Sequence, residues 1–112
     1  MDGCLFCSIA SGQIPATIVY QDEDVVAFRD IHPVAPFHVL VIPRVHLASL
    51  ADASEADAAM LGRLMLAAGR IARDEGFEGR GYRTIVNTGA EAGQTVHHLH
   101  VHVLAGKTLS WP

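Results

Sequence analysis

The stretch His98-Leu99-His100-Val101-His102-Val103-Leu104 alternates histidine with aliphatic residues. Because successive side chains of a β-strand point to opposite faces, this alternation predicts a strand, which we place over Val96 to Leu104. Its three histidines would share one face, and the aliphatic residues between them would pack into a core on the other face. His97 has the opposite parity to the three histidines, so we expect it to be a partly buried or interface residue.

Three imidazoles side by side on one strand face indicate a functional site. A single histidine on a strand is usually a structural polar residue, whereas clustered histidines bind metals or act as acids, bases or nucleophiles. The loop directly before them, from Gly89 to Thr95, contains two glycines and ends in a hydroxyl group. Such a loop can direct backbone N–H groups and the Thr95 hydroxyl at an anionic oxygen. Beside the histidines, it predicts a phosphate-binding site.

The remainder of the chain predicts an α+β fold with an antiparallel sheet. Ser54 to Glu75 is the long helix, because Ser54 is a suitable N-cap and apolar residues follow at helical spacing. Gly62 and Gly69 share one face of this helix, which we interpret as room for another backbone, such as that of a second subunit. The other predicted elements are a short helix over Cys4–Ala10 and strands over Thr17–Tyr20, Val25–Arg29, Val39–Ile42 and Tyr82–Asn87. Strands that follow one another as hairpins favour a five-stranded antiparallel sheet with one long and one short helix.

Composition limits the class of protein. The 112 residues are 50% hydrophobic with a mean hydropathy of +0.26, which suits one folded domain. No apolar run approaches the roughly 20 residues of a membrane helix, and no signal-peptide pattern opens the chain. The net charge of −4 and the lack of a Lys/Arg cluster argue against a nucleic-acid partner. Two cysteines without a thioredoxin-like context favour a reduced, cytoplasmic protein.

Cys4 and Cys7 form a second group of residues that could have a chemical function. A Cys-x-x-Cys spacing lets both thiolates face one ion from a single helical turn, and His46 could supply a third zinc ligand. The alternative is that the two cysteines are small buried residues on an apolar helix. Residue types alone leave both interpretations open.

Taken together, these residues resemble the histidine triad (HIT) family. Gly93-Gln94-Thr95-Val96 precedes the alternating histidines, the segment from Asp30 to His46 is similar to the central part of the family, and Asn87-Thr88-Gly89 is similar to the end of its penultimate strand. The C-terminal Ala105 to Pro112 resembles the tail of the Hint branch. The resemblance implies a single HIT domain over residues 1–112. It also implies hydrolysis or nucleotidyl transfer on nucleoside 5′-phosphoramidates or acyl-adenylates, by homodimers that share a ten-stranded sheet.

The resemblance also implies a role for each matching residue. His100 would attack the α-phosphorus, His102 would contact the phosphate and His98 would orient the nucleophile. His38 would lie beside these three, and Asp30 would bind the ribose hydroxyls. The other nucleotide-binding residues would be Phe6 and Ile31 near the base, and Asn87, Gly93, Gln94 and Thr95 on the phosphate side. An apolar base pocket discriminates weakly between purines, so conjugates of AMP and GMP are both expected substrates.

For zinc, the resemblance implies a complete ligand set. In zinc-bearing members of the wider family, the ligands match Cys4, Cys7, His46 and His98 of this chain. The Hint branch often lacks those cysteines, so this sequence combines a zinc-type N-terminus with a Hint-type tail. We expect a tetrahedral structural Zn²⁺ that fixes the segment carrying His100 and does not act as a Lewis acid.

Three other interpretations remain open at this point. The family also includes dinucleoside polyphosphate hydrolases, which attack the same α-phosphate. The three histidines would themselves be metal ligands in a metal-dependent protein, although no distant carboxylate ligand is evident. A nucleotide-binding regulator with only residual catalysis would have the same residues.

Overall fold

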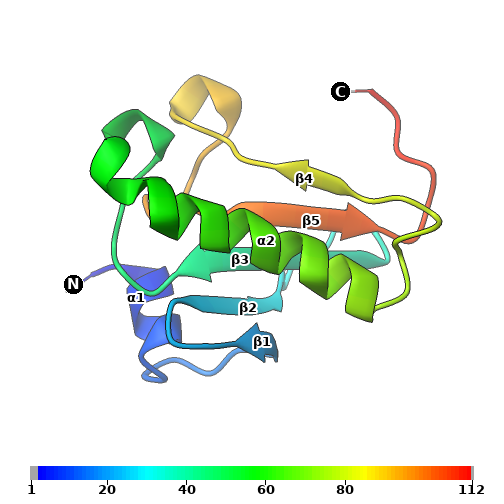
Figure 1. Cartoon of the computed structure of the whole chain (residues 1–112), viewed down its shortest axis with the longest axis horizontal. Coiled ribbons are helices and arrows are strands. Elements are labelled where there is room, and N and C mark those ends of the chain that lie inside the picture. The colour runs from blue at the N-terminus through cyan, green and yellow to red at the C-terminus, as the bar shows by residue number, and fades with distance from the viewer. Residues whose placement is uncertain (1–2, 112) are drawn as a thin grey trace.

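The computed structural model describes residues 3–111, and its central element is a five-stranded antiparallel sheet (Figure 1). The strands are β1 (Ile18–Gln21), β2 (Val25–Arg29), β3 (Phe37–Pro43), β4 (Arg83–Ile85) and β5 (Val101–Ala105). In space they follow the order β1-β2-β3-β5-β4. The helices are α1 (Leu5–Ala10) and α2 (Ala58–Asp74), and 3-10 turns cover Leu50–Asp52, Glu55–Asp57 and Ala90–Ala92. The predicted α+β class, with five antiparallel strands and one long and one short helix, is confirmed.

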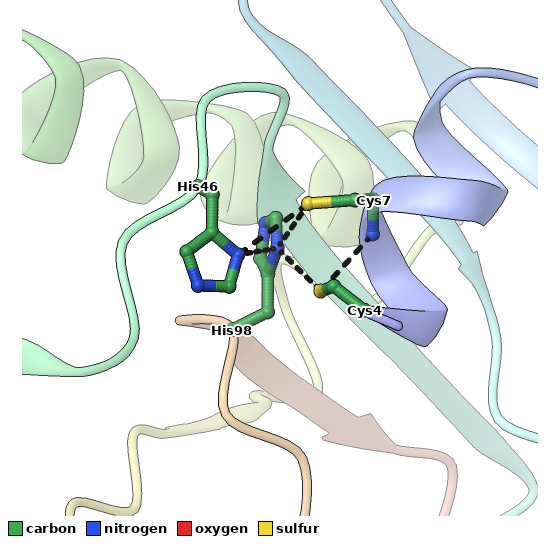
Figure 2. A group of neighbouring side chains, drawn as sticks. All are labelled: Cys4, Cys7, His46 and His98. Atoms are coloured by element: carbon green, nitrogen blue, oxygen red, sulfur yellow. Dashed lines mark hydrogen bonds between the residues drawn. The ribbon is translucent and has the colours of Figure 1, made fainter. Parts of the chain in front are cut away.

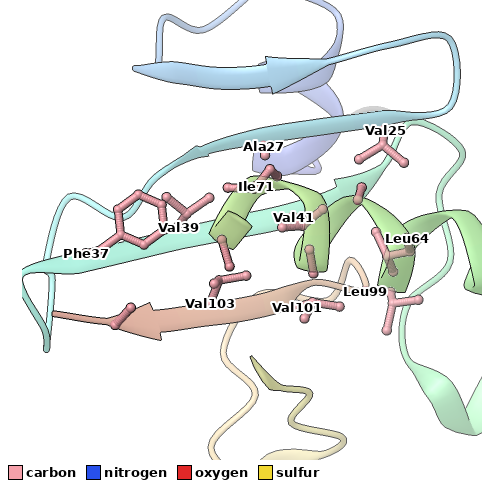
Figure 3. Packing of buried hydrophobic residues seen from close by; sticks show 14 residues of the cluster. Val25, Ala27, Phe37, Val39, Val41, Leu64, Ile71, Leu99, Val101 and Val103 are labelled. Carbon is pink, nitrogen blue, oxygen red and sulfur yellow. The ribbon is translucent and has the colours of Figure 1, made fainter. Parts of the chain in front are cut away.

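Helix α2 lies across one face of the sheet and closes the main hydrophobic core (Figures 1 and 3). The turn before the helix begins with a capping box, in which Ser54 and Asp57 satisfy each other's backbone N–H groups. The buried residues of α2 are Leu64, Ala67, Ala68, Ile71 and Ala72. They pack with Val39 and Val41 of β3 and with Leu99, Val101 and Val103. The odd-numbered residues of the histidine stretch therefore lie in the core, as the alternation predicts.

A second, smaller cluster covers the opposite face of the sheet. Phe6 of α1 packs there against four strand residues, which are Val26, Phe28, Leu40 and Ile42. These positions alternate with those that face α2, as expected for strands buried on both sides. Helix α1 therefore lies on the face of the sheet to which the even-numbered histidines point.

The last two strands are shorter than the sequence predicts. Strand β5 begins at Val101, where pairing with Val41 of β3 begins, and not at Val96. Strand β3 continues two residues beyond Val41, to Pro43, but the residues before Val101 leave the ladder, because the Leu99 N–H donates to the Leu47 carbonyl at 2.6 Å. Strand β4 covers only residues 83–85 of the predicted 82–87. Alternation identified the side-chain faces correctly, but the length of a strand depends on its neighbour.

One side of the molecule presents an open apolar surface. Strand β4 is an edge of the sheet, and the α2 residues Met65 and Leu66 are exposed, Leu66 at 76%. Among residues 3–111, a Cβ added at Gly62 would meet nothing within 4 Å outside its own helix, and one added at Gly69 would meet only the Tyr82 hydroxyl, at 3.4 Å. Among the described residues, no helix is long and apolar enough to cross a membrane.

Candidate functional site

The even-numbered histidines lie in a row on the α1 side of the sheet. The rings of His100 and His102 have centroids 5.0 Å apart, and Phe6 meets His100 edge-on at 5.1 Å. Beside them is a cavity of about 340 Å³. Its lining includes Leu5, Phe6, Ile9, Phe28, Asp30, Ile31, Leu40, Thr95, His100 and His102. The site thus combines a mostly apolar chamber with three histidines, which are His32, His100 and His102, together with Arg29, the Asp30 carboxylate and the Thr95 hydroxyl.

A backbone hydrogen bond fixes the tautomer of His100. Its Nδ1 lies 2.7 Å from the carbonyl oxygen of His98, and a carbonyl can only accept, so Nδ1 carries the proton. In the neutral ring, Nε2 is therefore left with a free lone pair. A buried imidazole with an unprotonated nitrogen at a cavity is a competent nucleophile.

His102 is held in a different state by a chain of hydrogen bonds. The Val34 N–H donates to His38 Nδ1 at 3.1 Å, so the proton of neutral His38 is on Nε2. That Nε2 lies 2.9 Å from His102 Nδ1, which must accept. The remaining nitrogen of His102, Nε2, then carries an N–H and can donate a hydrogen bond to a ligand oxygen.

Burial keeps these two rings neutral. Desolvation, followed by the nearby His100 and His38, lowers the pKa of His102 from 6.5 to about 4, against an opposing effect from Asp30. Desolvation also lowers the pKa of His38, against an opposing effect from Asp30, whose Oδ2 lies 3.4 Å from His38 Nε2. The tautomers assigned to His38 and His102 are therefore those of the protein at neutral pH.

His98 points away from the cavity toward two cysteines and a second histidine (Figure 2). It is completely buried, and its Nε2 lies 2.8 Å from the Pro43 carbonyl oxygen, so Nε2 carries the proton and Nδ1 has a lone pair. That Nδ1 lies 3.4 Å from Cys4 Sγ, 3.4 Å from Cys7 Sγ and 3.2 Å from His46 Nδ1. Cys7 Sγ also lies 3.4 Å from His46 Nδ1. Four ligand atoms thus surround one point.

These separations fit the edges of a zinc tetrahedron. Bonds of about 2.3 Å to sulfur and about 2.05 Å to nitrogen give nitrogen–sulfur edges of about 3.5 Å and nitrogen–nitrogen edges of about 3.3 Å. Helix α1 brings its two thiols to one side, since Cys4 caps the helix and accepts the Cys7 N–H. Both cysteines are free thiols. The residues present therefore fit Zn²⁺ with a Cys₂His₂ ligand set.

The ribose and base candidates lie at the cavity. Asp30 Oδ1 accepts the His32 N–H at 2.8 Å, which holds the carboxylate at the end of β2. Ile31 is 86% exposed at the mouth of the cavity, whereas Phe6 is buried in its wall. The inward-facing Phe28 and Leu40 also line the cavity, although the sequence analysis did not single them out. The sequence did contain a signal for them. Phe28 and Leu40 lie in predicted strands two residues from Asp30 and His38, respectively, and residues two apart on a strand share a face.

The phosphate-side candidates divide into two groups. Thr95 lines the cavity, but Asn87 and Gly93 do not. Gln94 is only 6% exposed, and its side chain accepts the Gly89 N–H and donates to the carbonyls of Ala48 and Val96. The Gln94 side chain therefore holds the loop together, and only its backbone is left for a ligand. His97 is exposed in the single chain, so it is not partly buried there, and its other expected place, at an interface, stays a prediction.

Known proteins have the same fold and similar sequences. The chain matches the HIT domain over residues 11–109. It is 49% identical over 108 residues to a HIT-like protein of Synechococcus elongatus, covering 96% of this chain and 94% of that protein. It is 46% identical over 110 residues to a 14 kDa zinc-binding protein of Zea mays, covering 96% and 85%. A solved HIT family hydrolase from Legionella pneumophila superposes with a TM-score of 0.97 at 44% identity, covering 98% of each chain.

Proposed function

The chain belongs to the HIT family, and on this premise we propose that it is a nucleotide hydrolase. It cleaves AMP or GMP from phosphoramidates or acyl-adenylates through a nucleotidyl group held covalently on His100. The observation that carries this proposal is the tautomer of His100. Its Nδ1–H is engaged by the His98 carbonyl at 2.7 Å, so its other nitrogen is available for attack at the cavity.

The reaction takes two displacements at phosphorus. First, His100 Nε2 attacks the α-phosphorus, the P–N bond breaks, and the amine leaves with the bonding electron pair and takes up a proton. Second, water attacks the same phosphorus, the bond to His100 breaks, and AMP leaves while the proton of the water goes to solvent. The His102 Nε2–H and the Thr95 hydroxyl donate hydrogen bonds to the phosphoryl oxygens as charge develops on them. An acceptor other than water makes the same protein a nucleotidyl transferase.

The cavity accommodates the nucleoside without reading the base closely. Asp30 accepts hydrogen bonds from the ribose hydroxyls at the mouth of the cavity, and Phe6 and Ile31 contact the purine. Phe28 and Leu40 give the cavity an apolar wall, and the polar residues of its lining are Arg29, Asp30, His32, Thr95, His100 and His102. An apolar wall discriminates between similar purines by only small factors in kcat/KM, so we expect both AMP and GMP conjugates to react.

Zinc has a structural role in this proposal. Cys4, Cys7, His46 and His98 hold the ion, which joins α1 to the segment before β5. The His98 carbonyl also positions the His100 ring. By fixing His98, the ion would stabilise the orientation of the His100 ring without contacting the substrate. The printed name of the maize relative, a zinc-binding protein, agrees with this assignment.

The open surface of α2 and β4 supports a homodimer. The exposed Met65 and Leu66 flank Gly69 on one helix face, next to Tyr82 and the unpaired edge of β4. Edge strands and exposed apolar patches are both stabilised by a partner. Pairing of two β4 edges generates the ten-stranded sheet expected from the sequence.

A turnover panel tests the proposed activity. The protein is assayed with adenosine 5′-phosphoramidate, an aminoacyl-adenylate and a diadenosine polyphosphate, with AMP release followed in each case. We expect the phosphoramidate to give a high kcat/KM, and activity to persist in chelator as long as circular dichroism shows a folded protein. A protein that binds AMP but turns over none of the three is a regulator. Loss of turnover in chelator without loss of structure indicates a metal-dependent enzyme instead.

A further inference from the structure

A basic groove at the β4 side of the molecule is not used by the reaction described above. It has a volume of about 360 Å³ and lies between the start of β4 and the segment after β5. It is lined by Arg80, Gly81, Tyr82, Arg83, Gly106, Lys107, Thr108 and Leu109, without a carboxylate among them. Three of the eight Lys and Arg residues of an otherwise acidic chain thus gather in one groove.

These cations lack neutralising partners. Among residues 3–111, no ion pair involves Arg80, Arg83 or Lys107, whereas Arg63 and Arg70 elsewhere each pair with an aspartate. Arg80 is placed over the Phe77 ring, and Arg83 donates one N–H to the Ser110 carbonyl at 2.8 Å. Within residues 3–111, the other guanidinium N–H groups of Arg83 make no hydrogen bond. A groove lined by one sign of charge concentrates ligands of the opposite sign.

The register of the sheet places Arg83 next to the reaction site. Ile85 of β4 is opposite His102 of β5, and Arg83 is opposite Leu104. Residues opposite each other in an antiparallel pair share a face, so Arg83 and His102 lie on the same side of the sheet. Diagonal neighbours of this kind are about 7–8 Å apart, which a long side chain can span.

We propose that this groove is a subsite for the leaving group and selects nucleotide conjugates whose amine carries a carboxylate. This inference rests on the proposed function, because it assigns the substrate class of that same site. The α-phosphate lies at His100 and His102, and the carboxylate of the leaving group extends past His102 to Arg83 and Lys107. Arginine binds a carboxylate through two parallel hydrogen bonds, and Thr108 can donate a third.

The test compares pairs of substrates that differ only in charge. AMP joined through nitrogen to glycine is compared with its glycinamide analogue, and AMP joined to glycylglycine with its terminal amide. The measured quantity is the ratio of kcat/KM for acid over amide in each pair, determined for the wild type and for each variant. Comparing ratios between proteins removes the intrinsic difference between the leaving groups.

The variants separate charge recognition from structure. Lys107→Gln and Arg83→Gln should each lower the acid-over-amide ratio, by about tenfold in the pair whose carboxylate reaches the groove. Arg83→Lys keeps the charge but not the two parallel hydrogen bonds and should give a ratio between those of the wild type and Arg83→Gln, whereas the control Arg63→Gln, at a distant cation on α2, should keep the wild-type ratio. High salt should lower the wild-type ratio more than that of Lys107→Gln, which retains only the Arg80 and Arg83 charges of the groove.

The outcomes are distinguishable. Ratios that stay at the wild-type value in both Lys107→Gln and Arg83→Gln, while the amides are hydrolysed, overturn the subsite and leave the proposed function standing. Failure of the wild type to hydrolyse any of the four conjugates contradicts the proposed function and removes this inference with it.

Discussion

Replacing His102 by glutamine should make the protein less sensitive to acid. The pKa of His102 is about 4 in the folded chain instead of the ordinary 6.5, mainly because the ring is desolvated. Between these two values the unfolded chain binds a proton that the folded chain does not. The free energy of unfolding must therefore fall as pH decreases from about 6.5 to about 4, and must be unaffected by this group above that range.

The size of the effect follows from the shift in pKa. A difference of about 2.5 units at 1.36 kcal/mol each sets a ceiling of about 3.4 kcal/mol. The ring of His102 is partly open to solvent, which screens its charge, so we expect about 2 kcal/mol. A glutamine side chain can still accept the His38 N–H through its carbonyl oxygen, so His102→Gln removes the titration and keeps the hydrogen bond.

Urea denaturation at about pH 7 and about pH 4.5 measures this difference. The loss of unfolding free energy between the two pH values should be smaller in His102→Gln than in the wild type by about 2 kcal/mol. Zinc release also depends on pH, so only the difference between the two proteins is interpreted. His32→Gln, at an exposed position, should behave like the wild type. Equal losses in wild type and His102→Gln would refute the account of a desolvated, neutral His38–His102 pair.

Three further results are expected. Cys4→Ser should lose stoichiometric zinc by metal analysis and melt at least about 5 °C lower than the wild type. The control His97→Gln, at an exposed position beside the ligand His98, should retain the metal. Zinc bound equally by both variants contradicts the assigned ligand set. Asp30→Ala should lower the preference for ribose over 2′-deoxyribose conjugates by about tenfold in kcat/KM, and an unchanged preference would mean that another group binds the ribose. Light scattering should give the mass of two 12.0 kDa chains for the wild type and of one for Leu66→Glu, and a monomeric wild type at micromolar concentration rules out the dimer.

The sequence alone predicts the faces of the histidine stretch but not its hydrogen bonds. Alternation is a local property, so the burial of Leu99, Val101 and Val103 under α2 follows from it directly. The start of β5 at Val101 depends instead on distant groups, because the Leu99 N–H bonds the Leu47 carbonyl and His98 Nε2 bonds the Pro43 carbonyl, each more than 50 residues away in the chain. Strand length is set by such distant pairing, which local patterns do not contain.

The tautomers of the histidines likewise could not be predicted from the sequence. They depend on backbone groups, namely the carbonyls of Pro43 and His98 and the amide of Val34, which every residue type possesses. Gln94 shows the same limit, because its position in the loop before the histidines suggested a ligand contact, whereas its buried side chain bonds three backbone groups. The residue types that carry the chemistry were visible in the sequence, but their protonation and orientation required the fold.

Trapping the covalent intermediate tests the central claim most directly. The protein is mixed with adenosine 5′-phosphoramidate, quenched in alkaline denaturant during turnover, since a phosphorus–histidine bond is labile in acid, and its intact mass and peptide map are determined. The account predicts one adenylyl group per chain, located on His100, and its absence in His100→Ala, which should bind AMP but lose essentially all turnover. Near wild-type turnover by His100→Ala, or an adenylyl group located on another residue, would contradict it.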